Sequence, residues 1–185
     1  VLDDIEARGF YMANRSLAVL RKLFNWAMDE RGIVETSPIG RKMTRGKETE
    51  RKRALSDDEV RAIWRSAETV GGLNGAAVKM LILTGQRNKV VAGMKWSEIK
   101  DGVWTIPATE SGRSKNKLTQ IVPLSSQAIE LLKGVPSHTG NDYVFGSGKR
   151  GDKPLYIGSK LKGKFDKLCG FNDWVWNDLR GLVAT

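Results

Sequence analysis

Two arginines stand in settings that would let them bind one phosphate together. Arg87 follows Gly85, which ends a predicted apolar helix, so its side chain lies at a junction where it can be aimed at a ligand. Arg180 lies in an Asp-Leu-Arg run with apolar residues on both sides. Attack on a phosphodiester puts extra negative charge on the non-bridging oxygens, which two guanidiniums can hold through charge-assisted hydrogen bonds of fixed geometry. Either arginine alone is more simply a surface or ion-paired residue, but their paired contexts favour a phosphate site.

A polar stretch between two predicted strands offers cations for acid catalysis. A lysine at the turn of a β-hairpin can enter a DNA groove and protonate a departing 5′ oxygen. Lys115 suits this role, and Lys117 and Arg113 are close competitors. The simpler alternative, in which all three face solvent and phosphates, fits these residues equally well.

The basic charge of the chain indicates a polyanion partner. The 185 residues carry a net charge of +10, and cations that neutralise phosphates release counterions and so drive association. Half of the net charge falls between residues 41 and 53, where two glutamates accompany seven basic residues: Arg41, Lys42, Arg45, Lys47, Arg51, Lys52 and Arg53. This run suits a solvated linker. Because a linker needs no such charge excess, we expect it to contact nucleic acid as well.

The composition argues against several other classes of protein. His138 is the single histidine, so neither a zinc site nor a Ser-His-Asp triad can be assembled convincingly. Cys169 is the single cysteine and suits an apolar filler. Apolar stretches such as 76–83 are far short of a bilayer span, and no basic-then-apolar signal pattern opens the sequence. We therefore expect a cytoplasmic protein that uses no metal.

Apolar periodicity and capping residues predict mostly helical structure. The first amphipathic helix spans 14–32, with Asn14 or Ser16 as its cap and Gly32 at its end. It needs a partner for its apolar face, so we expect the sequence to begin inside a helical domain. After the basic run, Ser56 and Glu59 form a capping box that opens the next helix. Further helices are predicted over 74–84, from Ser125 or Ser126 to Leu132, over 159–168 and over 177–184.

Two short apolar runs predict a β-hairpin. Strands are expected over 103–106 and 118–122, with Pro123 ending the second, and residues 143–145 suit a short strand or extended segment. Helices around a small antiparallel sheet imply an α+β fold that is mainly helical.

Seven short motifs follow one another along the chain. They are Leu83-Thr-Gly-Gln-Arg87, Ala92-Gly-Met-Lys-Trp-Ser-Glu-Ile99, Trp104-Thr-Ile-Pro-Ala108, Lys115-Asn116, Val122-Pro-Leu-Ser125, Tyr143-Val-Phe145 and Asp178-Leu-Arg180. In order and spacing they resemble the tyrosine recombinases, the phage-type integrases that cut and rejoin DNA. The resemblance covers nearly the whole chain. A basic RNA-binding domain would need only the charge and leaves this ordered series unexplained.

The resemblance implies a domain organisation and a set of site residues. Residues 1–40 would be the end of a helical core-binding domain, 41–54 a basic linker, and 55–185 an integrase-like catalytic domain without its C-terminal tyrosine segment. Arg87 and Arg180 would be the catalytic arginine pair, and the motif at Val122 selects Lys115 as the hairpin lysine. The two domains would form a clamp on duplex DNA, with no metal or nucleotide cofactor, as a monomer in solution and as a tetramer on DNA in the complete enzyme.

Three departures from the family pattern bear on activity. Asn177 stands where the second arginine motif usually has a histidine, and an amide cannot exchange protons near neutral pH. Val90 stands where an acid usually follows the first arginine, so Arg87 would lack an orienting partner. No tyrosine follows Arg180, and the three present, Tyr11, Tyr143 and Tyr156, suit packing or edge positions.

Two functions remain for this sequence. The first is site-specific recombination through a 3′-phosphotyrosyl intermediate, although no tyrosine follows Arg180 to act as the nucleophile. The second is a catalytically inactive, DNA-binding remnant of a recombinase, which the Asn177 and Val90 replacements favour.

Overall fold

The computed structural model describes residues 2–49, 51, 53–108, 118–136, 141–147 and 152–183. The chain divides into two compact units, Val1–Lys52 and Arg53–Thr185, and each is described by itself. Within the described residues, no helix is both long and apolar enough to cross a membrane.

The first unit consists of two helices and a segment that returns along them. The helices are α1 (Leu2–Glu6) and α2 (Phe10–Asp29). The predicted amphipathic helix is confirmed, but it starts at Phe10, after Gly9, whose φ of 131° suits a residue without a Cβ. Asn14 therefore lies inside the helix and is not its cap. The helix ends at Asp29, before the predicted Gly32.

Polar side chains of α2 hold the returning segment in place. The Arg21 guanidinium donates to the carbonyl oxygens of Gly40 and Met43, at 3.2 and 2.8 Å. The Asn14 amide accepts from the backbone N–H of Arg45 at 2.8 Å and donates to the Gly46 carbonyl. Gly40 and the first residues of the predicted linker 41–54, as far as Gly46, are thus bonded to α2.

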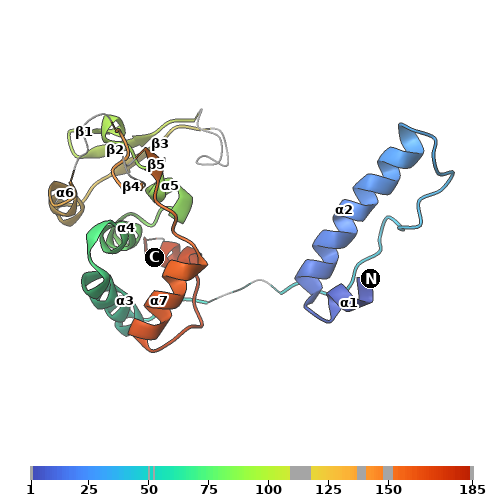
Figure 1. The fold of residues 1–185 in the computed structure, drawn as a ribbon, viewed down its shortest axis with the longest axis horizontal. Coiled ribbons are helices and arrows are strands. Elements are labelled where there is room, and N and C mark those ends of the chain that lie inside the picture. The colour runs from blue at the N-terminus through green and yellow to red at the C-terminus, as the bar shows by residue number, and fades with distance from the viewer. Residues whose placement is uncertain are drawn as a thin grey trace. The chain divides into compact units, whose positions relative to one another are not determined.

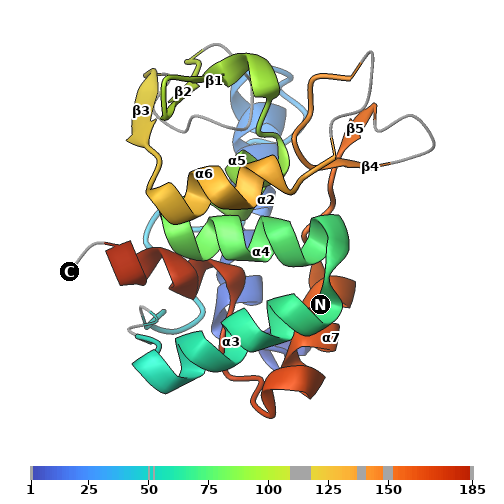
Figure 2. The ribbon, with the colours of Figure 1, turned by 90° about the vertical axis from the view of Figure 1, so that its left-hand side faces the viewer.

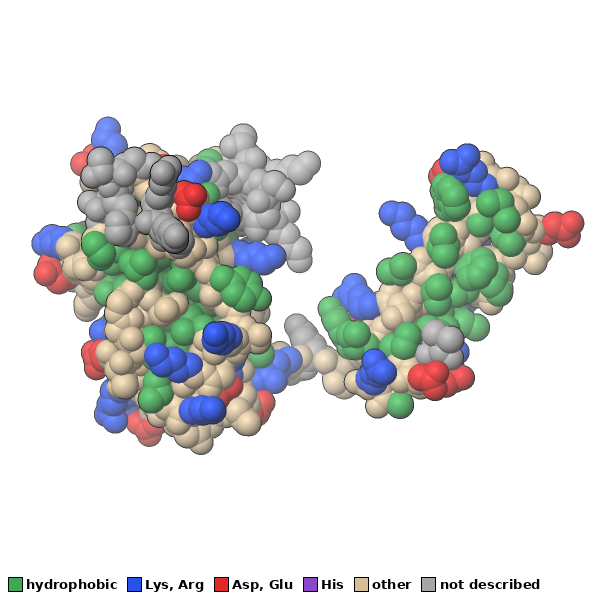
Figure 3. Space-filling view, in the orientation of Figure 1, with side chains coloured by type: hydrophobic (Ala, Val, Ile, Leu, Met, Phe, Trp, Pro, Cys, Tyr) green, Lys and Arg blue, Asp and Glu red, His purple; other side chains and the backbone are tan. Residues whose placement is uncertain are grey.

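One side of α2 is buried and another is apolar but exposed. Ala13, Leu17 and Ala27 are buried. Several apolar side chains of α2 are exposed, and Figure 3 shows hydrophobic atoms over much of the visible face of this unit. The exposed apolar residues of α2 are Phe10, Tyr11, Met12, Val19, Leu23 and Trp26.

The second unit packs helices around a central one and places two small sheets beside them. Its helices are α3 (Asp57–Val70), α4 (Gly72–Thr84), α5 (Asn88–Ala92), α6 (Ser126–Lys133), α7 (Ser159–Cys169) and the 3₁₀ helices η1 (Trp96–Glu98) and η2 (Trp176–Val183). Its strands are β1 (Ile99–Lys100), β2 (Val103–Ile106), β3 (Gln120–Pro123), β4 (Gly146–Ser147) and β5 (Lys153–Pro154). This architecture confirms the predicted α+β class, mainly helical with small antiparallel sheets (Figure 1).

Helix α4 forms the centre of this unit. It lies between α3 and α6, and η2 runs alongside it (Figure 2). Such a position requires apolar residues on most sides, and Ala77, Val78, Met80 and Leu81 are all buried. Contact with α3 is close at Gly75, where an added Cβ would lie 2.2 Å from the Ala67 carbonyl oxygen.

The predicted hairpin strands pair, and the second strand runs over Gln120–Pro123 in place of the predicted 118–122. Strand β2 pairs antiparallel with β1 and β3, and Trp104 lies opposite Val122. Pro123 was predicted to end the second strand but is its last residue. It lies on an edge strand, where a residue without an N–H can be accommodated. In the segment 143–145, Tyr143 forms only an isolated bridge with Lys95.

Candidate active site

Arg87 is positioned by the abrupt end of α4. Gly85 adopts a left-handed conformation with φ of 60°, and its N–H donates to the Leu81 carbonyl oxygen, which closes the helix as predicted. Arg87 then takes an extended backbone conformation and serves as the N-cap residue of α5. Its side chain is half-buried. Within the described residues, its guanidinium has no hydrogen-bond or ion-pair partner.

A buried face of η2 and of the residues before it fixes Arg180. Trp174, Trp176 and Leu179 are buried, while Val175 and Asn177 between them are exposed. The indole rings of Trp174 and Trp176 meet edge to face, with centroids 5.0 Å apart. This packing holds η2 against the core, so its polar residues project from a fixed backbone.

One hydrogen bond brings the two arginine motifs together. The Nε–H of Arg180 donates to the carbonyl oxygen of Gly85 at 3.3 Å, across 95 positions of sequence. Gly85 lies two residues before Arg87, so η2 sits against the junction that carries the first arginine. Both side chains are half-buried. The arrangement leaves the Nη groups of Arg180 without a partner among the described residues.

Asn177 lies on the same side of η2 as Arg180. In a 3₁₀ helix, side chains three positions apart eclipse each other, since the helix has three residues per turn. Asn177 and Arg180 are three apart, and the Asn177 side chain is exposed. Its amide can therefore hydrogen-bond an anion held by Arg180.

Val90 belongs to the core of the domain. Its side chain is 1% exposed and packs in the cluster that contains Val91 and Met94. A carboxylate at this position would lose its hydration, and valine instead adds to the apolar contacts of α5. Asn88, the residue after Arg87, is half-buried and makes two hydrogen bonds. Its side-chain amide donates to the Ile157 carbonyl oxygen at 3.2 Å and accepts from the Lys89 backbone N–H at 2.8 Å.

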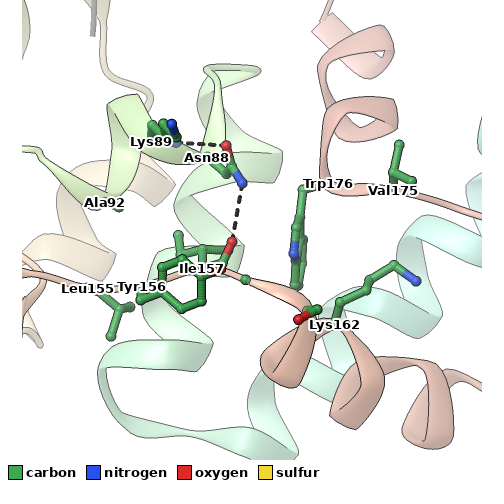
Figure 4. Close-up of a pocket in the computed structure, with 11 residues that line it drawn as sticks. Asn88, Lys89, Ala92, Leu155, Tyr156, Ile157, Lys162, Val175 and Trp176 are labelled. Atoms are coloured by element: carbon green, nitrogen blue, oxygen red, sulfur yellow. Dashed lines mark hydrogen bonds between the residues drawn. The ribbon is translucent and has the colours of Figure 1, made fainter. Parts of the chain in front are cut away.

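A hollow is lined by residues that neighbour the two arginine motifs in sequence (Figure 4). It lies between α5, the segment that enters α7, and the start of η2, and its volume is about 330 Å³. Two of its lining residues adjoin these motifs in sequence, because Asn88 follows Arg87 directly and Trp176 precedes Asn177. The sequence patterns did not indicate it, because residues from three distant segments line it: Asn88, Lys89, Ala92, Leu155, Tyr156, Ile157, Gly158, Ser159, Lys162, Val175 and Trp176.

The three tyrosines lie in different surroundings. Tyr156 is 80% exposed and borders the hollow. Tyr11 is exposed on α2, with the Arg15 guanidinium 4.8 Å from its ring centre. Tyr143 is half-buried beneath the Lys95 ammonium.

The basic residues predicted to contact DNA divide into three groups. Arg41, Lys42, Lys47 and Arg51 are exposed. Arg45 and Arg53 are half-buried and bind acidic side chains of their own units. Lys52, Arg113, Lys115 and Lys117 lie outside the described residues.

Arg45 joins the returning segment to α1. Its Nη1 lies 2.7 Å from the Asp3 carboxylate and 3.5 Å from that of Glu6. The guanidinium is thus directed towards acidic side chains of its own unit, which the sequence pattern of a basic run did not reveal.

Cys169 takes the structural position predicted for it. Its thiol is half-buried, and its sulfur lies 3.2 Å from the Ser66 hydroxyl on α3. Burial raises the pKa of this thiol, which disfavours the reactive thiolate. Cys169 therefore contributes to the contact between α3 and α7.

Comparison with known proteins identifies relatives of this chain. Residues 53–179 match the phage integrase family, which is more than half of the sequence. Prophage integrase IntZ of Escherichia coli K12 is 31% identical over 107 residues, or 56% of this chain. The match covers 26% of IntZ, so the chain spans about a quarter of that relative.

Solved structures share the fold at low sequence identity. A lambda integrase (75–356) dimer bound to a COC′ core site aligns with 99% of this chain and 69% of its own, with a TM-score of 0.72 and 24% identity. XerH recombinase bound to a palindromic difH substrate aligns with 99% of this chain and 58% of its own, with a TM-score of 0.71 and 17% identity. The sequence resemblance noted above is confirmed: this chain belongs to the phage integrase family.

Proposed function

We propose that this chain is part of a tyrosine recombinase that binds duplex DNA and acts on one phosphate of its backbone. The observation that supports the proposal is the hydrogen bond from Arg180 Nε to the Gly85 carbonyl, which brings the second arginine motif against the end of α4, two residues before Arg87. The net charge of +10 supports a polyanionic substrate.

Each side chain has a role in the proposed reaction. Arg87 and Arg180 hold the non-bridging oxygens of the scissile phosphate and stabilise the charge that grows on them during attack. Asn177 donates a hydrogen bond to the same phosphate. Lys115 protonates the 5′ oxygen as its bond to phosphorus breaks. A tyrosine oxygen forms the new bond, which leaves a 3′-phosphotyrosyl linkage and a free 5′-hydroxyl.

The proposal is tested by DNA binding of single variants. A preferred duplex is selected from a random pool, and affinities for it and for random duplex are compared. We expect Arg87→Ala and Arg180→Ala to weaken binding to the preferred duplex more than to random duplex, since only the former presents a scissile phosphate in register. Arg61→Ala is the control, because Arg61 is exposed on α3 and pairs with Asp58. Equal losses on both duplexes would reduce Arg87 and Arg180 to general phosphate contacts.

A second candidate function, DNA binding without cleavage, is favoured by two residues. Asn177 supplies no proton near neutral pH, and Val90 is buried where an acid would orient Arg87. A nicked suicide substrate separates the two candidates: a covalent adduct at one of Tyr11, Tyr143 or Tyr156 supports cleavage by this chain itself. Selective binding to the preferred duplex without a covalent adduct supports DNA binding without cleavage by this chain.

The proposed setting of the protein follows from its partner. A DNA recombinase of this kind would act in the cytoplasm, at the nucleoid. We propose that it is a monomer when free and assembles as a tetramer on DNA, as the lambda integrase tetramer does on a Holliday junction. Sedimentation with and without the preferred duplex tests this assembly.

A further inference from the structure

Arg53, the first residue of the second unit, uses its whole guanidinium within that unit. Its Nη2 donates to Glu59 Oε1 at 2.5 Å, and its Nη1 donates to Glu59 Oε2 at 3.2 Å and to the Ala54 carbonyl at 2.7 Å. Its Nε donates to the Asp173 carbonyl oxygen at 2.5 Å. The side chain is 22% exposed. One residue thus ties together the entry of the chain, the start of α3 and the segment before η2.

The Glu59 carboxylate is held by α3 itself. Glu59 and Ser56 form a capping box, in which the carboxylate accepts from the Ser56 N–H at 2.9 Å. The Arg53 guanidinium and the Ser56 N–H lower the pKa of Glu59 to about 2, so it stays ionised across the ordinary pH range. The acceptor that fixes Arg53 is therefore both charged and anchored.

Asp173, which accepts the hydrogen bond from Arg53 Nε, lies shortly before the residues of the proposed phosphate site in η2. Asp173 lies next to the buried Trp174, and Asp178 accepts from the Val175 N–H at 2.9 Å at the start of η2. Arg180 follows on the same 3₁₀ helix and bonds to Gly85. A displacement of the backbone at Asp173 would therefore displace η2 as well.

We propose that Arg53 is a positioning residue, which sets the place of η2, and with it Asn177 and Arg180, against the junction at Arg87. This assignment replaces the expectation that Arg53 contacts DNA, and its functional importance rests on the proposed function above. Arginine is required because its planar fork can bind a carboxylate with two nitrogens while Nε points elsewhere. A lysine ammonium could pair with Glu59 but has no further group for the Asp173 carbonyl.

Hydrogen exchange and NMR test the proposal without DNA. The probes are the amide of Asp178, which bonds to the Val175 carbonyl, and the Nε–H of Arg180. At a temperature well below unfolding, Arg53→Ala and Arg53→Lys should speed exchange over residues 174–180 by about tenfold and shift the Arg180 Nε resonance, while α3 beyond its first turn keeps its protection. The Arg61→Ala control should change neither.

The outcomes separate positioning from general stabilisation. If the Arg53 variants lower the melting temperature but leave exchange over 174–180 and the Arg180 signal unchanged, the positioning role is wrong. If Arg53→Ala does not fold, the exchange and NMR results for Arg53→Lys alone distinguish a positioning role from general stabilisation. In a second arm, Arg53→Lys should reduce the preference for the selected duplex over random duplex. A wild-type chain with no such preference would reject the proposed function and leave the exchange result standing.

Discussion

Arg87 and Arg180 reach one junction by different physical means. Arg87 is placed by a glycine that stops a buried helix, and Arg180 by indole rings that bury one side of η2. The sequence allowed both to be named, because Gly85 after an apolar helix and a charged residue among apolar ones are local signals. Their proximity is a tertiary fact that spacing alone does not encode.

The contacts of other singled-out residues could not be predicted from the sequence. The engagement of Arg53 depends on Asp173, which is distant in sequence, and a basic run gives no sign of such a contact. The same holds for Arg45, whose partners lie on α1. Asn177 was identified by its place in the motif, and the 3₁₀ geometry of η2 explains how it can share a ligand with Arg180.

Asn177→Ala should weaken binding to the preferred duplex without affecting stability. Loss of one hydrogen bond to the phosphate costs about 1 kcal/mol, or roughly fivefold in affinity. Because the side chain is exposed, the melting temperature should stay the same. Asn172→Ala, in the exposed loop before η2, is the matched control. Equal effects of the two variants would remove Asn177 from the site.

At the scale of elements, capping and periodicity predicted most of the second unit. The capping box at Ser56, the end of α4 at Gly85 and the cap of α6 at Ser125 all have the predicted form. The first helix was misjudged at both ends. Asn14 is a strong cap by type, but here its side chain bonds to residues 45 and 46, a contact that only the folded unit reveals.

The close contact of α3 with α4 should make Gly75 intolerant of a side chain. Gly75→Ala would press a Cβ against the Ala67 carbonyl oxygen and cost about 1–3 kcal/mol. Gly163→Ala, in α7 where no heavy atom lies within 4 Å of the added Cβ, should instead stabilise by about 0.5–1 kcal/mol. Urea denaturation measures both. A neutral Gly75→Ala variant would show that α3 and α4 are less closely packed than described.

The Glu59 carboxylate should make stability depend on acid pH. Its pKa is lowered from 4.5 in the unfolded chain to about 2 when folded, chiefly by the Arg53 guanidinium. Its stabilising contribution is thus fully present above pH 4.5 and is lost as the pH falls towards 2. In thermal melts, the melting temperature of the wild type should exceed that of Glu59→Gln at pH 6, and the two melting temperatures should converge near pH 2. A difference in melting temperature that stays constant from pH 6 to pH 2 would contradict the lowered pKa of Glu59. Asp58→Asn is the control for the loss of a surface charge.

At the scale of the whole molecule, the sequence predicted the fold class and the family. The ordered motifs run from Leu83 to Arg180, and the family match over residues 53–179 confirms their interpretation. The division into domains predicted from the basic run stays a prediction; the boundary between the two compact units falls after Lys52, within the predicted linker 41–54. The bonding of residues 40–46 to α2 was beyond prediction, because charge does not specify which polar groups find partners.

The most direct test of a shared phosphate site is a double-mutant cycle in DNA binding. Binding free energies to the preferred duplex are measured for wild type, Arg87→Ala, Arg180→Ala and the double variant. Two guanidiniums on one phosphate predict that the double variant loses less than the sum of the single losses, by about 1 kcal/mol or more. Losses that add to within about 0.3–0.5 kcal/mol would mean that the two arginines act at independent places, and the central claim would be wrong.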